Sequence, residues 1–202
     1  MITIYDANAY LRTALHRGDQ LSASADPRLI FERAMQPTNT EIWVWDGERH
    51  NDRRRAIFPG YKIRDYTGQE DIFAGIELYR ELLAYSRAIQ IEVPTYEADD
   101  VCATLAKKFS AENQRVTIWT NDFDFHQLAN LPGLLIRGMR PKEGVAPHLV
   151  ALYKALQGDS SDKIPGLPGF GPKSWTNLVG LQDQLNELFL RRDVAGIRAF
   201  ED

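Results

Sequence analysis

Three acidic clusters between Tyr96 and Pro172 most constrain what the chain can fold into. In order along the sequence they are Glu97-Ala98-Asp99-Asp100, Asp122-Phe123-Asp124 and Asp159-Ser160-Ser161-Asp162. Carboxylates that converge repel one another and raise each other's pKa, so a fold keeps such a set ionised only where cations neutralise it. The last cluster leads into a glycine-rich run from Gly166 to Gly171, whose backbone amides could hold a phosphodiester strand beside those cations.

Size and composition indicate one sizeable core, or one core with a small appended lobe, since 44% of the 202 residues are hydrophobic. Cys102 is the only cysteine, so no intrachain disulfide can form, and a reduced intracellular setting with Cys102 in the core is expected. No apolar stretch reaches the roughly 18 residues that span a bilayer, and the first residues lack a signal-peptide pattern. We therefore expect a cytoplasmic protein with no membrane partner.

The net charge of −4 argues against a nucleic-acid partner only at first sight. If nine carboxylates gather at one metal centre, the remainder of the molecule carries a net charge of +5. Those nine are Asp6, Asp46, Glu97, Asp99, Asp100, Asp122, Asp124, Asp159 and Asp162. Basic runs lie around them, at residues 53–55, 62–64, 107–108 and 137–142; each run alone is more typical of a solvated face, but their placement around the acids favours a nucleic-acid partner.

Short apolar runs that are rich in β-branched and aromatic residues predict five buried strands, at residues 2–5, 42–45, 89–93, 116–119 and 134–136. Helical patterns lie between and after them, at residues 9–16, 27–35, 70–85, 98–109 and 147–156. This alternation predicts an α/β sandwich around a mainly parallel sheet. Beyond Gln157 no strand signal remains, and the tail is expected to be a lobe of short helices.

The predicted strands place the acids where a ligand would bind. Asp6 and Asp46 end the first two strands, and Asp122 and Asp124 follow the fourth. Ligands of open α/β sheets bind at the carboxyl ends of the strands. Glu97 to Asp100 begin a helix, where the helix dipole stabilises carboxylates. Taken singly, these acids could be capping or turn residues, but that interpretation explains their joint placement poorly.

The motifs Tyr96-Glu97-Ala98-Asp99-Asp100-Val101, Thr120-Asn121-Asp122-Phe123-Asp124 and Gly158-Asp159-Ser160-Ser161-Asp162-Lys163-Ile164-Pro165-Gly166 closely resemble the 5′-nuclease superfamily. That family includes the nuclease domain of bacterial DNA polymerase I and the bacteriophage 5′→3′ exonucleases and flap endonucleases. Segments around Asp6 and Asp46 resemble its two amino-terminal acidic motifs, so the resemblance covers nearly the whole chain. It implies a PIN-like, Rossmann-like sandwich with a helical arch and a carboxy-terminal helix-three-turn-helix lobe.

The resemblance implies two Mg²⁺ ions, for which Mn²⁺ can substitute. Asp6, Asp46, Glu97, Asp99 and Asp100 would form the first metal cluster, and Asp122, Asp124, Asp159 and Asp162 the second. A pair of ions about 4 Å apart can activate a water on one side of a phosphodiester and stabilise the leaving oxygen on the other. Asn8 is a candidate to orient the first cluster, with a turn role as the alternative.

The segment from Arg54 to Lys62 resembles the family segment in which an arginine and a Tyr-Lys pair face the scissile phosphate. Arg54 and Lys62 would then be catalytic, with Lys62 stabilising charge on the phosphate and Tyr61 stacking on a terminal base. Family members commonly carry Tyr-Lys-x-x-Arg, whereas Arg64 stands one position early here, which weakens its assignment to DNA binding. Residues from about 65 to 88 are expected to form the arch.

The run from Ile164 to Ser174 resembles the family's helix-three-turn-helix, which grips duplex backbone without reading bases. The residues that would bind DNA there are Gly166, Gly169, Gly171, Lys173 and Ser174, and the loop could bind K⁺ through its carbonyl groups. The expected domains are a catalytic core over residues 1–156, which includes the arch, and a DNA-binding lobe over residues 157–202.

The leading functional hypothesis is a metal-dependent 5′→3′ exonuclease and structure-selective flap endonuclease. A PIN-like ribonuclease and a non-catalytic DNA-binding module are the alternatives. The expected partner is DNA with a 5′ end or 5′ flap, with an RNA–DNA hybrid and a replicative polymerase as further candidates. We expect a monomer in the cytoplasm of a bacterial or phage-infected cell.

Overall fold

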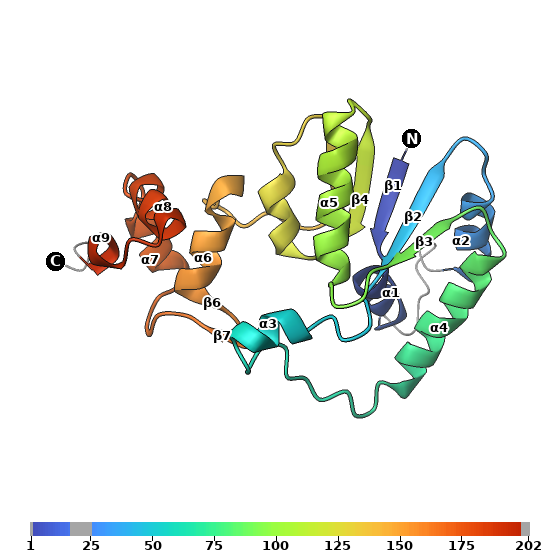
Figure 1. The fold of residues 1–202 in the computed structure, drawn as a ribbon, viewed down its shortest axis with the longest axis horizontal. Coiled ribbons are helices and arrows are strands. Elements are labelled where there is room, and N and C mark those ends of the chain that lie inside the picture. Colours follow the sequence, from blue (N-terminus) through green and yellow to red (C-terminus); the bar gives the residue numbers. More distant parts are fainter. Residues whose placement is uncertain (1, 17–25, 199–202) are drawn as a thin grey trace.

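A five-stranded parallel sheet forms the centre of the computed structural model, which describes residues 2–16 and 26–198 (Figure 1). The strands are β1 Ile2–Asp6, β2 Thr40–Trp45, β3 Ile89–Glu92, β4 Val116–Thr120 and β5 Leu134–Gly138. Their order across the sheet is β3-β2-β1-β4-β5, and all four neighbouring pairs are parallel. The five predicted strands and the α/β class are confirmed.

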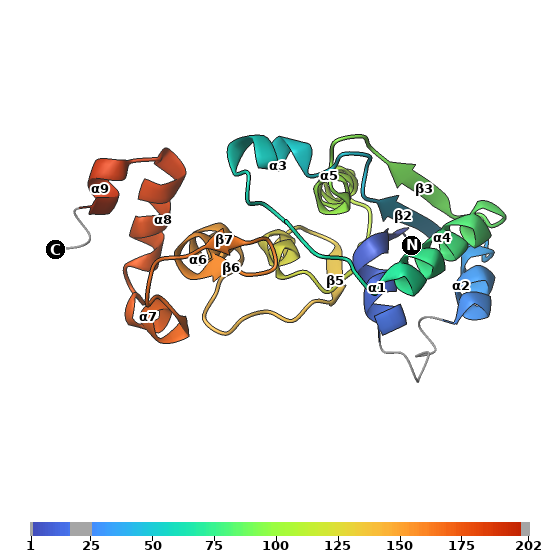
Figure 2. The ribbon, with the colours of Figure 1, turned by 90° about the horizontal axis from the view of Figure 1, so that it is seen from below.

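Helices cover both faces of the sheet (Figure 2). One face packs against α1 Ala7–His16, α2 Pro27–Ala34 and α4 Glu70–Ala84, while the other packs against α5 Ala98–Ala111 and the 3₁₀ helix η2 Phe123–Leu128. Because side chains alternate along a strand, Tyr5 and Trp43 point to the first face and Ile4 and Ile42 to the second.

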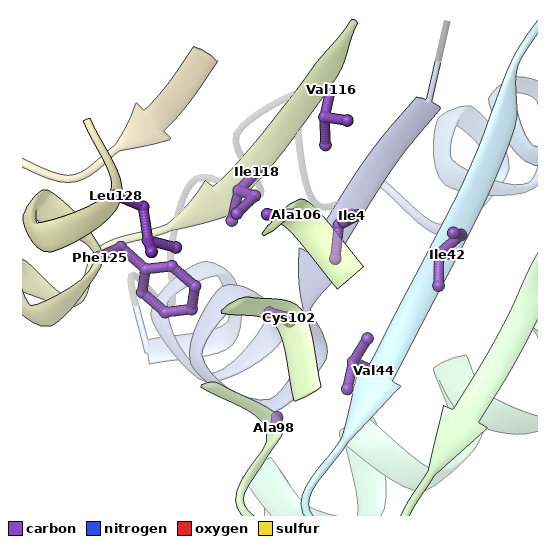
Figure 3. Close-up of a cluster of buried hydrophobic side chains, with 10 residues drawn as sticks. All are labelled: Ile4, Ile42, Val44, Ala98, Cys102, Ala106, Val116, Ile118, Phe125 and Leu128. Atoms are coloured by element: carbon purple, nitrogen blue, oxygen red, sulfur yellow. The ribbon is translucent and has the colours of Figure 1, made fainter. Parts of the chain in front are cut away.

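The core beneath α5 is drawn in Figure 3. Small side chains on this helix, Ala98, Cys102 and Ala106, let it lie close to the sheet, against Ile4 and Ile118. Cys102 is fully buried, as expected. The close packing fixes the amino end of α5, with its acidic first turn, beside the carboxyl ends of β1 and β2.

Two features of the core differ from the sequence prediction. The segment expected to form an arch contains α4, whose Ile76, Tyr79 and Leu83 are buried against the sheet, so residues 70–84 are a layer of the core. Residues 58–69 form an irregular connection before α4, which passes beneath the sheet in the view of Figure 1. The short helix α3 Asp52–Ile57 was also missed, because it buries no side chain and so has no apolar periodicity.

The tail contains one more correction. A two-residue antiparallel pairing joins β6 Gly158–Asp159 to β7 Ile164–Pro165, although no strand was expected beyond Gln157. Glycines make it possible, since a Cβ on Gly166 would lie 2.2 Å from the carbonyl carbon of Gln157. This hairpin turns Asp159 and Asp162 back toward the main sheet, where both line the same pocket as Asp6.

The rest of the tail is a helical lobe, as predicted. Its helices are α6 Val150–Gln157, preceded by the 3₁₀ helix η3 Pro147–Leu149, and then α7 Pro172–Asn177, α8 Gln182–Arg191 and α9 Val194–Arg198. Trp175 anchors the lobe as expected, packing edge-to-face on Tyr153. The lobe's core begins at Val145, before the expected boundary at residue 156, and the division into domains stays a prediction.

None of the helices in the described ranges is long and apolar enough to cross a membrane.

Candidate active site

Acidic side chains from both halves of the chain line one pocket of about 750 Å³ at the carboxyl ends of the strands. Seven of the nine predicted metal ligands lie in its wall: Asp6, Asp46, Glu97, Asp99, Asp122, Asp159 and Asp162. Lys62 and Arg64 also line it, as does Lys154, which the sequence did not single out. Asp100 and Asp124 are not part of the wall, but each shares a cation with an acid that is. Arg54 contacts both Asp100 and Glu97, and Lys154 contacts both Asp124 and Asp159.

The first group of acids is held by the ends of β1 and β2 and by the start of α5. Asp6, which is 6% exposed, accepts hydrogen bonds from the Ala9 amide and the Thr120 hydroxyl, each at 3.3 Å. Asp46 accepts from the Ala98 amide at 2.9 Å and from the Asn8 side chain at 2.7 Å. Of the two roles that the sequence allowed for Asn8, this hydrogen bond favours the orienting one, at Asp46.

Glu97 is the most completely neutralised acid of the pocket. It precedes the first turn of α5 and is 3% exposed, with Arg54 and Lys62 both donating to its carboxylate and the Tyr61 hydroxyl donating at 2.8 Å. Burial alone would raise the pKa of Glu97, but the hydrogen bond and charge of Lys62, together with Arg54, hold it below its usual range. Glu97 stays ionised because cations surround it.

Asp6 and Asp99 lie in the opposite situation. Burial, with the negative charges of Asp46 and Asp99, raises the pKa of Asp6 to about 8. Burial, with the charge of Glu97, raises the pKa of Asp99 to about 7, although Arg54 lies 3.8 Å away. The side-chain cations near these two carboxylates therefore do not balance them, and a further positive charge at this point would favour their ionised forms.

The second group of acids is organised around Lys154, from α6. Its ammonium group bridges Asp124 and Asp159. Burial would raise the pKa of Asp159, but the hydrogen bonds from Lys154 and Ser161 lower it to about 2. Asp122 caps η2 by accepting from the Asp124 amide at 2.8 Å. No local sequence signal marked Lys154, because its role depends on the hairpin that returns Asp159 to the end of α6.

Within the described part of the chain, no three Asp, Glu, His or Cys side chains are grouped closely enough to hold a metal ion as they stand. Side-chain cations separate the acids: Lys62 contacts Glu97 and lies 3.7 Å from Asp162, while Lys154 lies between Asp124 and Asp159. The donor set nevertheless suits a hard divalent cation, since it consists of carboxylate oxygens. The raised pKa values of Asp6 and Asp99 mark the carboxylates whose charge the protein's own cations leave unbalanced.

Two residues of the segment expected to face the scissile phosphate, Tyr61 and Arg64, make contacts that the sequence did not predict. Tyr61 is 5% exposed and its hydroxyl donates to Glu97, so its ring is buried in this structure, and stacking on a base stays a prediction. Arg64 reaches the site despite its shifted position, donating to the Ser161 carbonyl at 3.1 Å and lying 3.7 Å from Asp162. Arg55, which was given no role, supports the segment by donating to the carbonyls of Tyr61 and Lys62.

The expected DNA-binding residues of the tail lie outside this pocket. Gly169, at φ +78°, and Gly171 have open space where a side chain would stand, and Lys173 is exposed at the start of α7. The Ser174 hydroxyl accepts from the Gly171 amide at 3.4 Å and so caps α7. Gly166 has a different reason to be glycine, since its neighbour Gln157 leaves no room for a side chain.

The electrostatics of the pocket predict that Asp6→Asn stabilises the protein when no metal is bound. The folded-state pKa of about 8 lies above the usual 3.8, so the ionised carboxylate costs the folded state stability as the pH rises from about 4 to about 8. At pH 8.5 in EDTA, the variant should gain on the order of 5 kcal/mol in free energy of unfolding by urea, because about four pKa units separate the folded from the unfolded carboxyl group. At pH 5 the gain should be much smaller. Equal stabilities of the two proteins at pH 8.5 would contradict the repulsion.

The comparisons with known proteins agree with this architecture. The family model described as the 5′-3′ exonuclease, N-terminal resolvase-like domain, matches residues 18–146. Thermostable DNA polymerase I of Thermus filiformis is 35% identical over 175 residues, which are 82% of this chain and 21% of the polymerase. The chain thus spans about a fifth of the length of that relative.

A second relative is covered to two thirds of its length. Flap endonuclease Xni of Shewanella halifaxensis is 35% identical over 171 residues, covering 80% of this chain and 67% of the relative. Among solved structures, the flap endonuclease of bacteriophage T5, in a pseudo-enzyme–product complex with DNA and metal ions, superposes with a TM-score of 0.59. That alignment covers 93% of this chain and 78% of the phage chain at 16% identity, and it supports the fold. With its parallel sheet, its acid-lined pocket and these matches, the chain belongs to the 5′-3′ exonuclease family.

Proposed function

We propose that this chain hydrolyses DNA phosphodiesters as a metal-dependent 5′→3′ exonuclease and structure-selective flap endonuclease. The observation that carries the proposal is the pocket itself, in which acids from the ends of β1, β2 and β4, from the start of α5 and from the β6–β7 hairpin meet beside Lys62 and Arg54. Two relatives of this chain, a 5′-3′ exonuclease of Aquifex aeolicus and the flap endonuclease Xni, carry names that support the same activity.

Two Mg²⁺ ions, or Mn²⁺ in their place, are the proposed cofactors. Asp6, Asp46, Glu97, Asp99 and Asp100 would hold one ion, and Asp122, Asp124, Asp159 and Asp162 the other. Such ions would activate a water and stabilise the leaving oxygen of the phosphodiester. The flexible side chains of Lys62 and Lys154 allow both ammonium groups to leave their acids, so the present ion pairs neutralise part of the pocket's charge without excluding metal ions.

Lys62 and Arg54 are the proposed phosphate-binding residues. Each already contacts Glu97, and so each stands at the edge of the pocket where a phosphate approaching the acids would lie. An ammonium or guanidinium group there stabilises negative charge that develops on the phosphate oxygens. Tyr61 contributes by positioning Glu97, and Asn8 by positioning Asp46.

The lobe would grip duplex DNA at a distance from the pocket. Gly169 and Gly171 leave space for a phosphate to approach the backbone, and Lys173 and Ser174 supply charge and a hydroxyl group. A K⁺ ion bound by carbonyl groups of this loop belongs to the same proposal. The proposed substrate is DNA with a 5′ end or flap, and an RNA–DNA hybrid and a replicative polymerase are further candidate partners. The protein would act as a monomer in the cytoplasm of a bacterial or phage-infected cell.

Cleavage of defined substrates tests the function. A 5′-flap duplex should be cut in Mg²⁺ and left intact in EDTA, and Asp99→Asn should lower the single-turnover rate by about 10³-fold or more, since it removes a ligand from the point of greatest unbalanced charge. Asp183→Asn, which changes an exposed acid of the lobe, is the matched control and should cut normally. Cleavage of RNA alone would favour the ribonuclease, and binding without any cleavage the non-catalytic module.

Lys62 and Arg64 are predicted to contribute unequally. Lys62→Ala should lower the single-turnover rate on a 5′-flap by about 10²-fold, on the scale of losing one donor to a developing oxyanion. Arg64→Ala should have a smaller effect, because Arg64 donates to the Ser161 carbonyl and is more exposed. Circular dichroism of both variants controls for the loss of the Lys62–Glu97 pair. A larger defect in Arg64→Ala would show that the electrophilic residue is misassigned.

A further inference from the structure

A second pocket, of about 730 Å³, lies between α3 and α5. Its wall has an apolar part, which includes Ile57 at 87% exposure, together with Val93 and Val101. We call this feature, lined by residues of α3, α5 and the segment 93–96, the α3–α5 groove.

The charge of the α3–α5 groove is positive. Arg53 and Lys107 lie in its wall, and neither has an acidic partner within the described residues. Asp100 is the one acid among the lining residues, and the Arg54 guanidinium already binds it at 3.0 Å. The groove therefore presents two unpaired cations to an approaching ligand, which favours an anionic one.

An aromatic side chain stands beside these cations. Tyr96 is 38% exposed, and the Arg53 guanidinium carbon lies 4.1 Å from the centre of its ring. Stacked aromatic and guanidinium planes next to basic side chains are the usual surface for single-stranded nucleic acid, on which bases stack without sequence preference. An acidic peptide would use the cations but has no base to place on this platform.

The groove is continuous with the acidic pocket. His50 lines both of them, and Arg54 lines the groove while donating to Glu97 of the pocket. A strand whose phosphate lies at Glu97 and Lys62 can thus continue into the groove past Arg54. Resting on the proposed function, we infer that the α3–α5 groove binds the single-stranded 5′ extension of the substrate, with Arg53 and Lys107 on its phosphates and Tyr96 under a base.

The test compares flap lengths in EDTA, where the proposed chemistry cannot run. The variant is the double substitution Arg53→Ala/Lys107→Ala, and both residues are exposed, so folding should be preserved. Its matched control, Lys108→Ala/Arg115→Ala, removes the same charge from two exposed residues outside the groove. Fluorescence anisotropy measures the binding of a nicked duplex without a flap and of a duplex with a flap of about 12 nucleotides, within the usual range for single-strand sites.

The expected result is a loss that depends on the flap. The groove variant should bind the flapped duplex about tenfold more weakly. The slope of the logarithm of the binding constant against the logarithm of the salt concentration should become shallower by about 1.4, because two phosphate contacts are lost and each contributes about 0.7 on a single strand. Binding of the flapless nick should not change, and the control variant should behave like the wild type.

Three results would overturn the inference: equal losses on both substrates, no loss on the flap, or tight binding of an oligoglutamate peptide that the groove variant loses while flap length has no effect. The outcome is separable from that of the proposed function. Flap cleavage in Mg²⁺ without any effect of the groove variant would keep the function and reject the groove. If the protein cleaved no DNA but still bound single strands through the groove, the groove would be kept and the proposed function rejected.

Discussion

Repulsion among carboxylates gathered in one pocket is the constraint on which the rest of the structure depends. The fold answers it with side-chain cations: Lys62 and Arg54 neutralise Glu97, and Lys154 bridges Asp124 and Asp159. These pairs are incomplete, since burial and neighbouring charge still raise the pKa values of Asp6 and Asp99. A structure that keeps such a cost within its core resembles other functional sites, where a pKa is shifted for a chemical purpose. Divalent cations would remove the cost and at the same time supply the chemistry.

The parallel sheet is what brings these residues together. Neighbouring parallel strands end at the same edge, so Asp6, Asp46 and Asp122 meet although they are far apart in the sequence. The small residues of α5 let the helix lie against the sheet and present Glu97 and Asp99 to the same point. The β6–β7 hairpin adds Asp159 and Asp162, and the backbone bond from the Lys62 amide to the Asp162 carbonyl, at 3.1 Å, ties the hairpin to the segment that carries Lys62. Stability and site geometry therefore rest on the same contacts.

The sequence predicted the features that a local pattern encodes. Runs such as Val116 to Trp119 marked each strand, and the acids that follow them marked the pocket. Features that depend on contacts between distant segments were missed. In the sequence Lys154 looks like an ordinary helix residue, because its partner Asp159 is brought to it only by the hairpin. Tyr61 likewise looks like an exposed aromatic residue, because its hydrogen bond to Glu97 joins two distant segments. The arch was misplaced because α4 combines exposed charged residues with the buried Ile76, Tyr79 and Leu83, a mixture that identifies neither a free arch nor a core helix without its partners.

Calorimetric titration of the metal-free protein with Mn²⁺ tests the central claim most directly, because it measures the neutralisation itself. The account predicts two ions bound per chain. It also predicts release of protons at pH 7, seen as a dependence of the heat on the buffer's ionisation enthalpy, since Asp6 and Asp99 with pKa values of about 8 and about 7 must ionise to bind. The proton release should vanish at pH 9, where both carboxylates are already ionised. Absence of Mn²⁺ binding, or binding with the same heat in every buffer at pH 7, would contradict the account.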